Sequence, residues 1–289
     1  MICSGICAAG DPEKPTFSFH ADANEIRLTF SATDQNDHGV ATLQATDVVV
    51  VDRDIVVRQF QTFSRADWTK VEIAILADNS ESVRPRFQKE LSDMLGLLSQ
   101  SQGIPDDSLS VICFRNSQPD LVCAGDCRTS HGVDRLASTQ PGGFTPLFDA
   151  IIFATDFLAR RSDPHTEKIL VVLSDGADTI SRHTLSDASE AAAQNEVEIY
   201  GVDLNHSTSS GSALLYHLSS ATGGRYFSGR ANATNVLDGI LEHFHATYVV
   251  SYRLPSHVSG FHAVRILPTH NLNLQFRSRS GYYYPDNIR

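Results

Sequence analysis

The sequence predicts an α/β protein in which a doubly wound, mainly parallel sheet is inserted into a β-sandwich-like domain formed by both chain ends. Three patterns carry this prediction. Strand-like and helix-like segments alternate between Val71 and about His245, several of these strands are apolar throughout, and both flanks contain only short strand-like segments. Alternating strands and helices give a mainly parallel sheet, and strands without polar residues are covered on both faces.

The N-terminal flank, residues 16–66, is expected to form a small antiparallel β unit. It contains the segments TFSFHA, EIRLTFSATD, DVVVVD and IVVRQFQTF, separated by turn clusters such as DQNDHG. The preceding residues 1–15, with Cys3 and Cys7, lack the basic leader and the sustained apolar core of a complete secretion signal. We expect them to form a disordered tail.

The central region, residues 67–245, is expected to form the α/β domain. VEIAILA begins it as an apolar strand, and the next segment has apolar residues at helical spacing. These apolar residues are Phe87, Leu91, Met94, Leu95 and Leu98. The later segments alternate in the same way: LSVICF, PLFDAIIFATDFLARR, KILVVLSD, SDASEAAAQN, VEIYGVDL, SALLYHLSSATGG and NVLDGILEHFHATY. Helices on both faces of the sheet follow from this alternation.

The C-terminal flank, residues 246–289, returns to strand-like segments in YVVSYRL, FHAVRILP and LNLQFRSRSGYYYP. Neither flank alone has enough strands to bury a core, whereas the two together do. We therefore expect residues 16–66 and 246–289 to pair in one β-sandwich-like domain that the α/β domain interrupts.

Charge and hydropathy exclude two classes of partner. The 289 residues carry 23 Lys and Arg against 34 Asp and Glu, and this formal net charge of −11 is spread along the sequence. Phosphate binding needs a concentrated basic face, so nucleic acid is not an expected partner. No apolar stretch approaches the roughly 20 residues that span a bilayer, so no membrane span is expected.

Three cysteines lie in the central region. Cys113 stands near the end of the apolar run LSVICF and is expected to be a buried thiol in a strand. Cys123 and Cys127 are separated by three residues of a glycine-containing loop, which permits a local disulfide if the protein matures in an oxidising compartment. The alternative for these three cysteines is a zinc site, which needs a fourth ligand and has only one histidine, His131, nearby in sequence.

Oxygen-bearing residues follow several of the predicted strands. An acid and two serines stand at alternate positions after the apolar strand in VEIAILADNSESV. A threonine follows in PGGFTPLFDA, and two acids follow in VVLSDGADT. These residues are Asp78, Ser80, Ser82, Thr145, Asp175 and Asp178. Ligands of open α/β sheets bind at the carboxyl ends of strands, and few acids with several hydroxyls suit a hard divalent cation. The alternative is that the hydroxyls cap helices and that Asp175 starts a turn.

This combination resembles the von Willebrand factor type A fold, which is Rossmann-like, and its metal-ion-dependent adhesion site. The family pattern is Asp-x-Ser-x-Ser after the first strand, a threonine in a later loop, and an aspartate in a strand-end Asp-Gly. With SDGADTISRHTL, VEIYGVDL, LSSATGGRYF and RSRSGYYYP, the chain is also similar to the bacterial von Willebrand A-related domain proteins first catalogued in Acidobacteria. That likeness covers about Thr16 to Pro285.

The resemblance implies a metal site made of five residues: Asp78, Ser80, Ser82, Thr145 and Asp175. Mg²⁺ is the expected ion, with Mn²⁺ and Ca²⁺ as alternatives, and a carboxylate of a partner protein is expected to bind it. In this family the threonine responds to the ligand-bound state, so Thr145→Ala should mainly weaken partner binding. Since an empty site at a sheet edge is expected to stay solvated, Asp78→Ala should lower cation and partner affinity with little effect on folding.

Two positions depart from the family pattern. Phe144 stands before the site threonine, where a glycine is common, and it narrows the rim of the site or offers a ligand a hydrophobic contact. Glu81 stands between the two site serines, where a small residue is common. Alternation along the loop is expected to point Glu81 away from the cation.

The expected function is a secreted or extracytoplasmic binding module that recruits an acidic group of a partner protein, not an enzyme. The competing classes are a metal-dependent hydrolase and an assembly protein in which the metal only stabilises loops. A hydrolase needs a base positioned near the metal, and the loop histidines His183 and His206 are expected to be surface residues. His243 and His245 point apart on a helix, so they do not form a metal pair.

Overall fold

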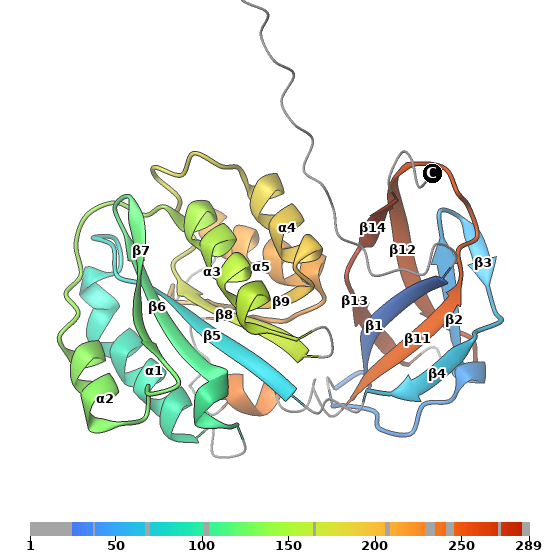
Figure 1. The fold of residues 1–289 in the computed structure, drawn as a ribbon, viewed down its shortest axis with the longest axis horizontal. Coiled ribbons are helices and arrows are strands. Elements are labelled where there is room, and N and C mark those ends of the chain that lie inside the picture. Colours follow the sequence, from blue (N-terminus) through green and yellow to red (C-terminus); the bar gives the residue numbers. More distant parts are fainter. Residues whose placement is uncertain are drawn as a thin grey trace, which may run out of the picture.

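The computed structural model describes residues 25–36, 38–66, 70–100, 104–163, 166–205, 209–228, 235–240, 246–270 and 273–284. The predicted tail, the TFSFHA segment, His206, His243 and His245 lie outside these residues. Figure 1 shows two parts side by side, one with helices around a sheet and one made of strands. No helix in the described part of the chain is long and apolar enough to cross a membrane.

The α/β part contains one six-stranded sheet. Its strands are β5 (Lys70–Asp78), β6 (Leu109–Arg115), β7 (Gln118–Ala124), β8 (Thr166–Ser174), β9 (Val197–Asp203) and β10 (Tyr226–Phe227). Their order in the sheet is β10-β9-β8-β5-β6-β7. Neighbouring strands are parallel except β6 and β7, which are antiparallel.

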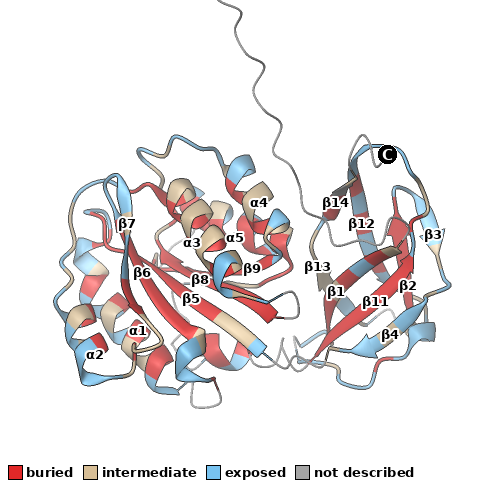
Figure 2. Cartoon of the chain, in the orientation of Figure 1, coloured by how far each residue is buried: buried red, intermediate tan, exposed pale blue. Residues whose placement is uncertain are grey.

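Helices cover both faces of this sheet. They are α1 (Phe87–Gln100), α2 (Ser130–Ala137), α3 (Leu147–Arg161), α4 (Leu185–Gln194) and α5 (Ser210–Thr222), with the short 3-10 helices η2 (Arg84–Arg86) and η3 (Asp106–Ser108). Residues 235–240 are also helical and pack on the same face as α1 and α2, while α3, α4 and α5 pack on the other. Along β5, Ile73 and Ile75 face the first group and Ala74 and Leu76 the second. The predicted doubly wound sheet is therefore confirmed, and its strands form the buried centre in Figure 2.

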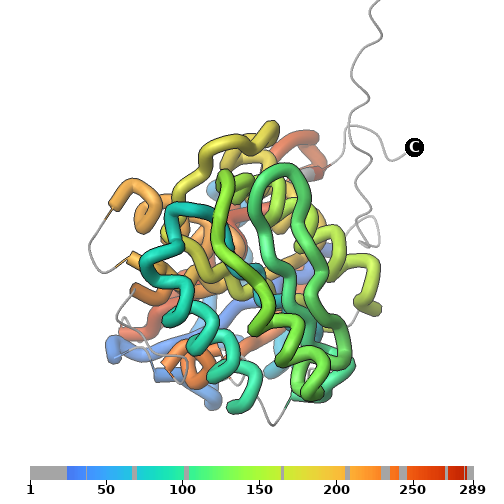
Figure 3. The backbone as a smooth tube through the Cα atoms, turned by 90° about the vertical axis from the view of Figure 1, so that its left-hand side faces the viewer, coloured from blue at the N-terminus to red at the C-terminus, as the bar shows by residue number. Residues whose placement is uncertain are grey.

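The sequence prediction lacks several elements of the α/β part, of which β7 and α2 are the longest. The segment QPDLVCA forms β7 at the edge of the sheet, where the glycine-containing stretch suggested only a loop, and α2 follows it. The β7 edge faces the viewer in Figure 3. Gln118 and Asp120 in the first half of β7 are polar and exposed, and only residues 121–124 are apolar, so its apolar run is shorter than those of the central strands.

The second part is a sandwich of two four-stranded sheets. Its elements are β1 (Glu25–Thr33), η1 (Ala45–Asp47), β2 (Val48–Asp52), β3 (Ile55–Val57), β4 (Thr62–Arg65), β11 (Thr247–Arg253), β12 (Gly260–Pro268), β13 (Gln275–Ser278) and β14 (Gly281–Tyr284). The sheet orders are β13-β1-β11-β4 and β14-β12-β2-β3. In each sheet, strands from before and after the α/β part are neighbours, as predicted for the two flanks. The exact domain boundaries stay a prediction.

Aromatic rings and one polar network fill the sandwich. Phe30 stacks on Tyr248 with ring centroids 5.7 Å apart. Asp52, which is fully buried, accepts hydrogen bonds at Oδ2 from Tyr252 at 2.8 Å and Tyr282 at 2.7 Å, and its Oδ1 lies 3.3 Å from Nδ1 of buried His262. Since Tyr252 belongs to one sheet and the other three residues to the opposite sheet, this network crosses the core.

The sandwich contacts the α/β part through its β13 edge. Ser280 N donates to Ala221 O at 3.2 Å, and Arg279 forms an ion pair with Glu196 at 3.5 Å. In Figure 1, β5 starts next to the sandwich and runs away from it. The carboxyl end of β5 therefore lies on the side of the sheet that faces away from the sandwich.

Candidate metal centre

Asp78 closes β5 at the carboxyl edge of the sheet, and its carboxylate organises the residues that follow. Its Oδ1 accepts from Ser80 N at 2.9 Å, and its Oδ2 accepts from Ser174 Oγ, at the end of β8, at 2.7 Å. The hydroxyls of Ser80 and Ser82 are 3.0 Å apart. Both site serines and the acid therefore converge at one point, as the alternate spacing predicts.

The loop that carries Thr145 is bonded to the loop after β5. Gly142 N donates to Asn79 O at 2.9 Å, and Glu81 N donates to Gly143 O at 2.9 Å. These two bonds bring the segment before α3 against the Asp-x-Ser-x-Ser stretch. Thr145 is thereby held at the same edge of the sheet as Asp78.

The loop after β8 completes the group. Asp175 follows Ser174 directly, and Ser174 Oγ accepts from Gly176 N at 3.0 Å. Thr179, in the same loop, donates from its N to Thr145 O at 2.8 Å and accepts from Thr145 N at its Oγ1 at 2.8 Å. Three loops, each carrying at least one of the five predicted residues, are thus joined by hydrogen bonds.

Burial at this edge differs from the expectation that the site stays solvated. Asp78 and Ser80 are 0% exposed and Thr145 is 2% exposed, whereas Ser82 is exposed and Asp175 half-buried. The expectation was wrong because the two neighbouring loops close over the end of β5. Burial raises the pKa of Asp78 to about 6, against the opposing hydrogen bonds from Ser80 and Ser174.

This donor set fits a hard divalent cation. It combines the carboxylates of Asp78 and Asp175 with three hydroxyls, and oxygen ligands of this kind are those that Mg²⁺ and Ca²⁺ take. Each carboxylate oxygen of Asp78 has one described donor and so keeps lone-pair capacity. A bound cation would supply positive charge and exchangeable coordination positions at this edge.

Asp178, also considered as an oxygen ligand, has another role. Its Oδ1 accepts from Leu147 N at 2.9 Å and from the hydroxyl of Ser181 at 2.5 Å, so it satisfies free backbone N–H groups in the first turn of α3. Beside it, Asp149 accepts at 2.8 Å from His183 Nδ1. Both contacts fix the loop after β8 to the start of α3, and so hold Thr145 in place.

Glu81 is not turned toward the predicted ligands. Its carboxylate accepts two hydrogen bonds from Arg84, at 2.6 and 2.8 Å, and the arginine lowers its pKa. Glu90, on α1, is fully buried near the site, and burial raises its pKa well above the ordinary range, with the charges of Asp78 and Asp175 adding to the effect. Both effects favour the neutral form of the Glu90 carboxyl.

Three further residues support the site and are absent from the sequence prediction. Ser174 donates to Asp78 as described, Asn205 Nδ2 donates to Asp175 O at 2.9 Å, and Arg86 donates to Asn205 Oδ1 at 2.8 Å. Ser174 had a signal in the sequence, because it is a polar residue at the end of an apolar strand. The other two act through contacts between loops far apart in sequence, which no local pattern reveals.

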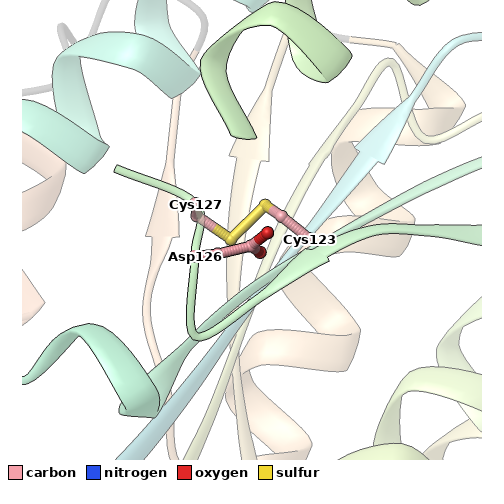
Figure 4. Close-up of side chains that lie close together, drawn as sticks. All are labelled: Cys123, Asp126 and Cys127. Carbon is pink, nitrogen blue, oxygen red and sulfur yellow. A yellow bond between two sulfur atoms is a disulfide. The ribbon is translucent and has the colours of Figure 1, made fainter. Parts of the chain in front are cut away.

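A second cluster of potential ligands is Cys123, Asp126 and Cys127, shown in Figure 4. Cys123 and Cys127 are joined by a disulfide, with an S–S distance of 2.11 Å, and Cys113 is free and buried. Both predictions are confirmed. The zinc alternative is wrong, because the disulfide takes both sulfurs.

Comparison with known proteins gives a family for the central region. Residues 73–177 match the family model described as von Willebrand factor type A domain, a segment that contains all five predicted site residues. No curated protein matches the sequence.

Solved structures show a looser similarity. Manganese-loaded TRAP protein of Plasmodium vivax is 14% identical, with 80% of this chain and 97% of that chain covered and a TM-score of 0.48. BatB of Bacteroides thetaiotaomicron is 16% identical, with 60% and 98% covered and a TM-score of 0.46. With TM-scores below 0.5, these similarities do not identify a family or a function for this chain. The family match alone identifies residues 73–177 as a von Willebrand factor type A domain, and the chain as a protein that carries one.

Proposed function

We propose that the carboxyl edge of the central sheet binds a divalent cation through Asp78, Ser80, Ser82, Thr145 and Asp175, and that the cation recruits a carboxylate of a partner protein. Mg²⁺ is the proposed ion, with Mn²⁺ and Ca²⁺ as alternatives. The observation that carries the proposal is the convergence of three hydrogen-bonded loops on the buried carboxylate of Asp78. Domains of the matched family are, in general, metal-dependent protein-interaction modules.

The position of the edge supports a binding role. It faces away from the sandwich, so the sandwich does not cover it. The disulfide and the family match favour a secreted or extracytoplasmic location, because structural disulfides persist in oxidising compartments.

A hydrolase remains the alternative class, and it needs a general base beside the cation. The histidine described in these loops, His183, bonds to Asp149 at the start of α3. Its ring therefore serves to hold the loop after β8, which favours binding over catalysis.

Partner capture from the native secretome or envelope tests the binding role. Wild type should retain a partner in Mg²⁺ and lose it in EDTA, and Asp78→Ala should retain none. Thr145→Ala should keep most of its cation affinity and lose capture. Asp134→Ala, at an exposed position on α2, is the matched control. Equal capture in Mg²⁺ and EDTA would favour the assembly role, in which the metal only stabilises loops.

A further inference from the structure

Phe144 is the most exposed large apolar residue in the loops of the candidate site, and its backbone is held by hydrogen bonds. Phe144, directly before Thr145, is 61% exposed. Its N–H donates to Asn116 Oδ1 at 3.2 Å, and its carbonyl accepts from Asn116 N at 2.8 Å. Single exposed apolar residues are common, but the backbone of this one is held by two hydrogen bonds to Asn116, in the β6–β7 turn.

The residue before Phe144 strengthens this constraint. Gly143 has φ of +81°, and a Cβ at this position would lie 2.1 Å from Asn116 Oδ1. The turn at Asn116, itself at φ +56°, and the Gly143 backbone are therefore fitted to each other. A side chain presented on such a backbone loses little conformational entropy when it binds, which is a property of interface hot spots.

A positively charged side chain, that of Arg115, lies near the same glycine-containing loop. Arg115 precedes Asn116 and is exposed, and its Nη1 lies 3.7 Å from the point where a Cβ on Gly142 would be. Within the described part of the chain, Arg115 forms no ion pair, whereas neighbouring Arg84 is bonded to Glu81 and to Pro141 O. In a chain of net charge −11, this rim offers an uncommitted positive charge.

We propose that Phe144 and Arg115 determine which partner the site accepts: a peptide segment with one acidic residue for the cation, an adjacent apolar side chain for Phe144 and a second acidic residue for Arg115. This inference rests on the proposed function. Charge complementarity selects an acidic segment, because both the cation and Arg115 are positive. The distance along the segment between the two acidic residues is set by the separation of the metal-site loop and the β6–β7 turn.

A displayed peptide library tests the inference. Each peptide carries one central Asp between randomised positions, and selection uses the full chain in Mg²⁺ with elution by EDTA. Wild type should enrich Leu, Ile or Phe at one offset from the Asp and Asp or Glu at another. Phe144→Ala should abolish the apolar preference and weaken the enriched peptides about tenfold, with Mg²⁺ affinity within about twofold of wild type.

Reversing the charge of Arg115 separates a role in partner selection from a purely structural role, because only the former changes which residues are enriched in the peptides. Arg115→Glu should replace the second acidic preference with Lys or Arg at the same offset. Leu267→Ala and Arg58→Gln, on the sandwich, are matched controls that should leave both preferences unchanged. The thermal midpoint of each variant checks folding.

The outcomes separate the two proposals. Mg²⁺-dependent peptides whose flanking preferences are the same in wild type, Phe144→Ala and Arg115→Glu would overturn the rim inference and leave the metal site standing. Peptides that bind equally in EDTA and to Asp78→Ala would overturn both. A selection without enrichment would overturn the rim inference, because the described surface should suffice for a short acidic segment.

Discussion

Asp52 and Asp78 are two of the buried aspartates that end strands in the described part of the chain, and their surroundings differ. Asp52, at the end of β2, has two tyrosine hydroxyls and His262 around its carboxylate. Asp78, at the end of β5, has one backbone N–H and one serine hydroxyl. Both side chains are 0% exposed.

The difference lies in charge compensation. His262 Nε2 lies 2.7 Å from Val258 O, and since a carbonyl can only accept, this nitrogen carries a proton. Its Nδ1 faces both Asp52 Oδ1 at 3.3 Å and the hydroxyl of Tyr282 at 3.0 Å, so the imidazole belongs to the hydrogen-bond network around the carboxylate. Burial raises the pKa of Tyr252 and Tyr282, so both hydroxyls stay protonated donors. Asp78 has no such network of aromatic side chains among its described contacts.

A buried carboxylate whose charge is balanced by several hydrogen-bond donors is compatible with a stable fold. A buried carboxylate with few such partners lowers the stability of the folded state when no cation is bound to it. The comparison therefore assigns Asp52 to the structure of the sandwich and Asp78 to ligand binding.

The largest expected effect is on the sandwich. Asp52→Ala should lower the free energy of unfolding by about 4 kcal/mol, because it leaves His262 and two tyrosine hydroxyls buried without their acceptor. Cation affinity should stay at the wild-type value in protein that remains folded. Urea unfolding measures the first and calorimetric titration the second, with exposed Asp54→Asn as the control. A loss below about 1 kcal/mol would remove the distinction between the two aspartates.

Replacing Asp78 is expected to raise the free energy of unfolding when no cation is bound, whereas replacing Asp52 lowers it. Each pKa unit is worth about 1.4 kcal/mol, so a pKa raised from 3.8 to about 6 corresponds to a cost of about 3 kcal/mol when the group is ionised. In EDTA at pH 7, Asp78→Asn should therefore be more stable than wild type by up to about 3 kcal/mol.

The pH dependence of this difference follows from the raised pKa. The folded state holds the Asp78 proton more tightly than the unfolded chain, so wild type regains stability as the pH falls through about 6 toward 4. The advantage of Asp78→Asn should shrink over the same range. Urea unfolding in EDTA at pH 7 and pH 4 checks both points, and an advantage that stays constant with pH would contradict them.

A smaller effect concerns cation affinity. At pH 5 about one tenth of a carboxylate with a pKa near 6 is ionised, against nearly all of it at pH 7.5. Mg²⁺ affinity should therefore fall about tenfold between pH 7.5 and pH 5. Affinity that does not change over this range would show that Asp78 is not a ligand.

The sequence predicts the central strands and the five candidate ligands because both leave local patterns. Apolar runs mark β5, β8 and β9, and the acid and hydroxyls follow them at their carboxyl ends. Asn205 and the Asp52 network leave no such pattern. Their contacts join strands and loops that are far apart in the chain, such as Asp52 with Tyr282, so only the fold brings them together.

The burial of Asp78 could not be predicted from the sequence. A strand-end position predicts a solvated carboxylate, but the bonds from Gly142 to Asn79 O and from Glu81 to Gly143 O close the loops over Asp78. Whether loops cover a strand end depends on their mutual hydrogen bonds, which the sequence of each loop does not fix.

The central claim is that Asp78 anchors a divalent cation, and calorimetric titration of wild type and Asp78→Ala with Mn²⁺ and Mg²⁺ at pH 7.5 tests it most directly. We expect one saturable site in wild type and none in Asp78→Ala, with Asp134→Ala binding as wild type does. Equal cation affinity in wild type and Asp78→Ala would show that Asp78 is not a ligand, and the serines and Thr145 would then be helix-capping and turn residues.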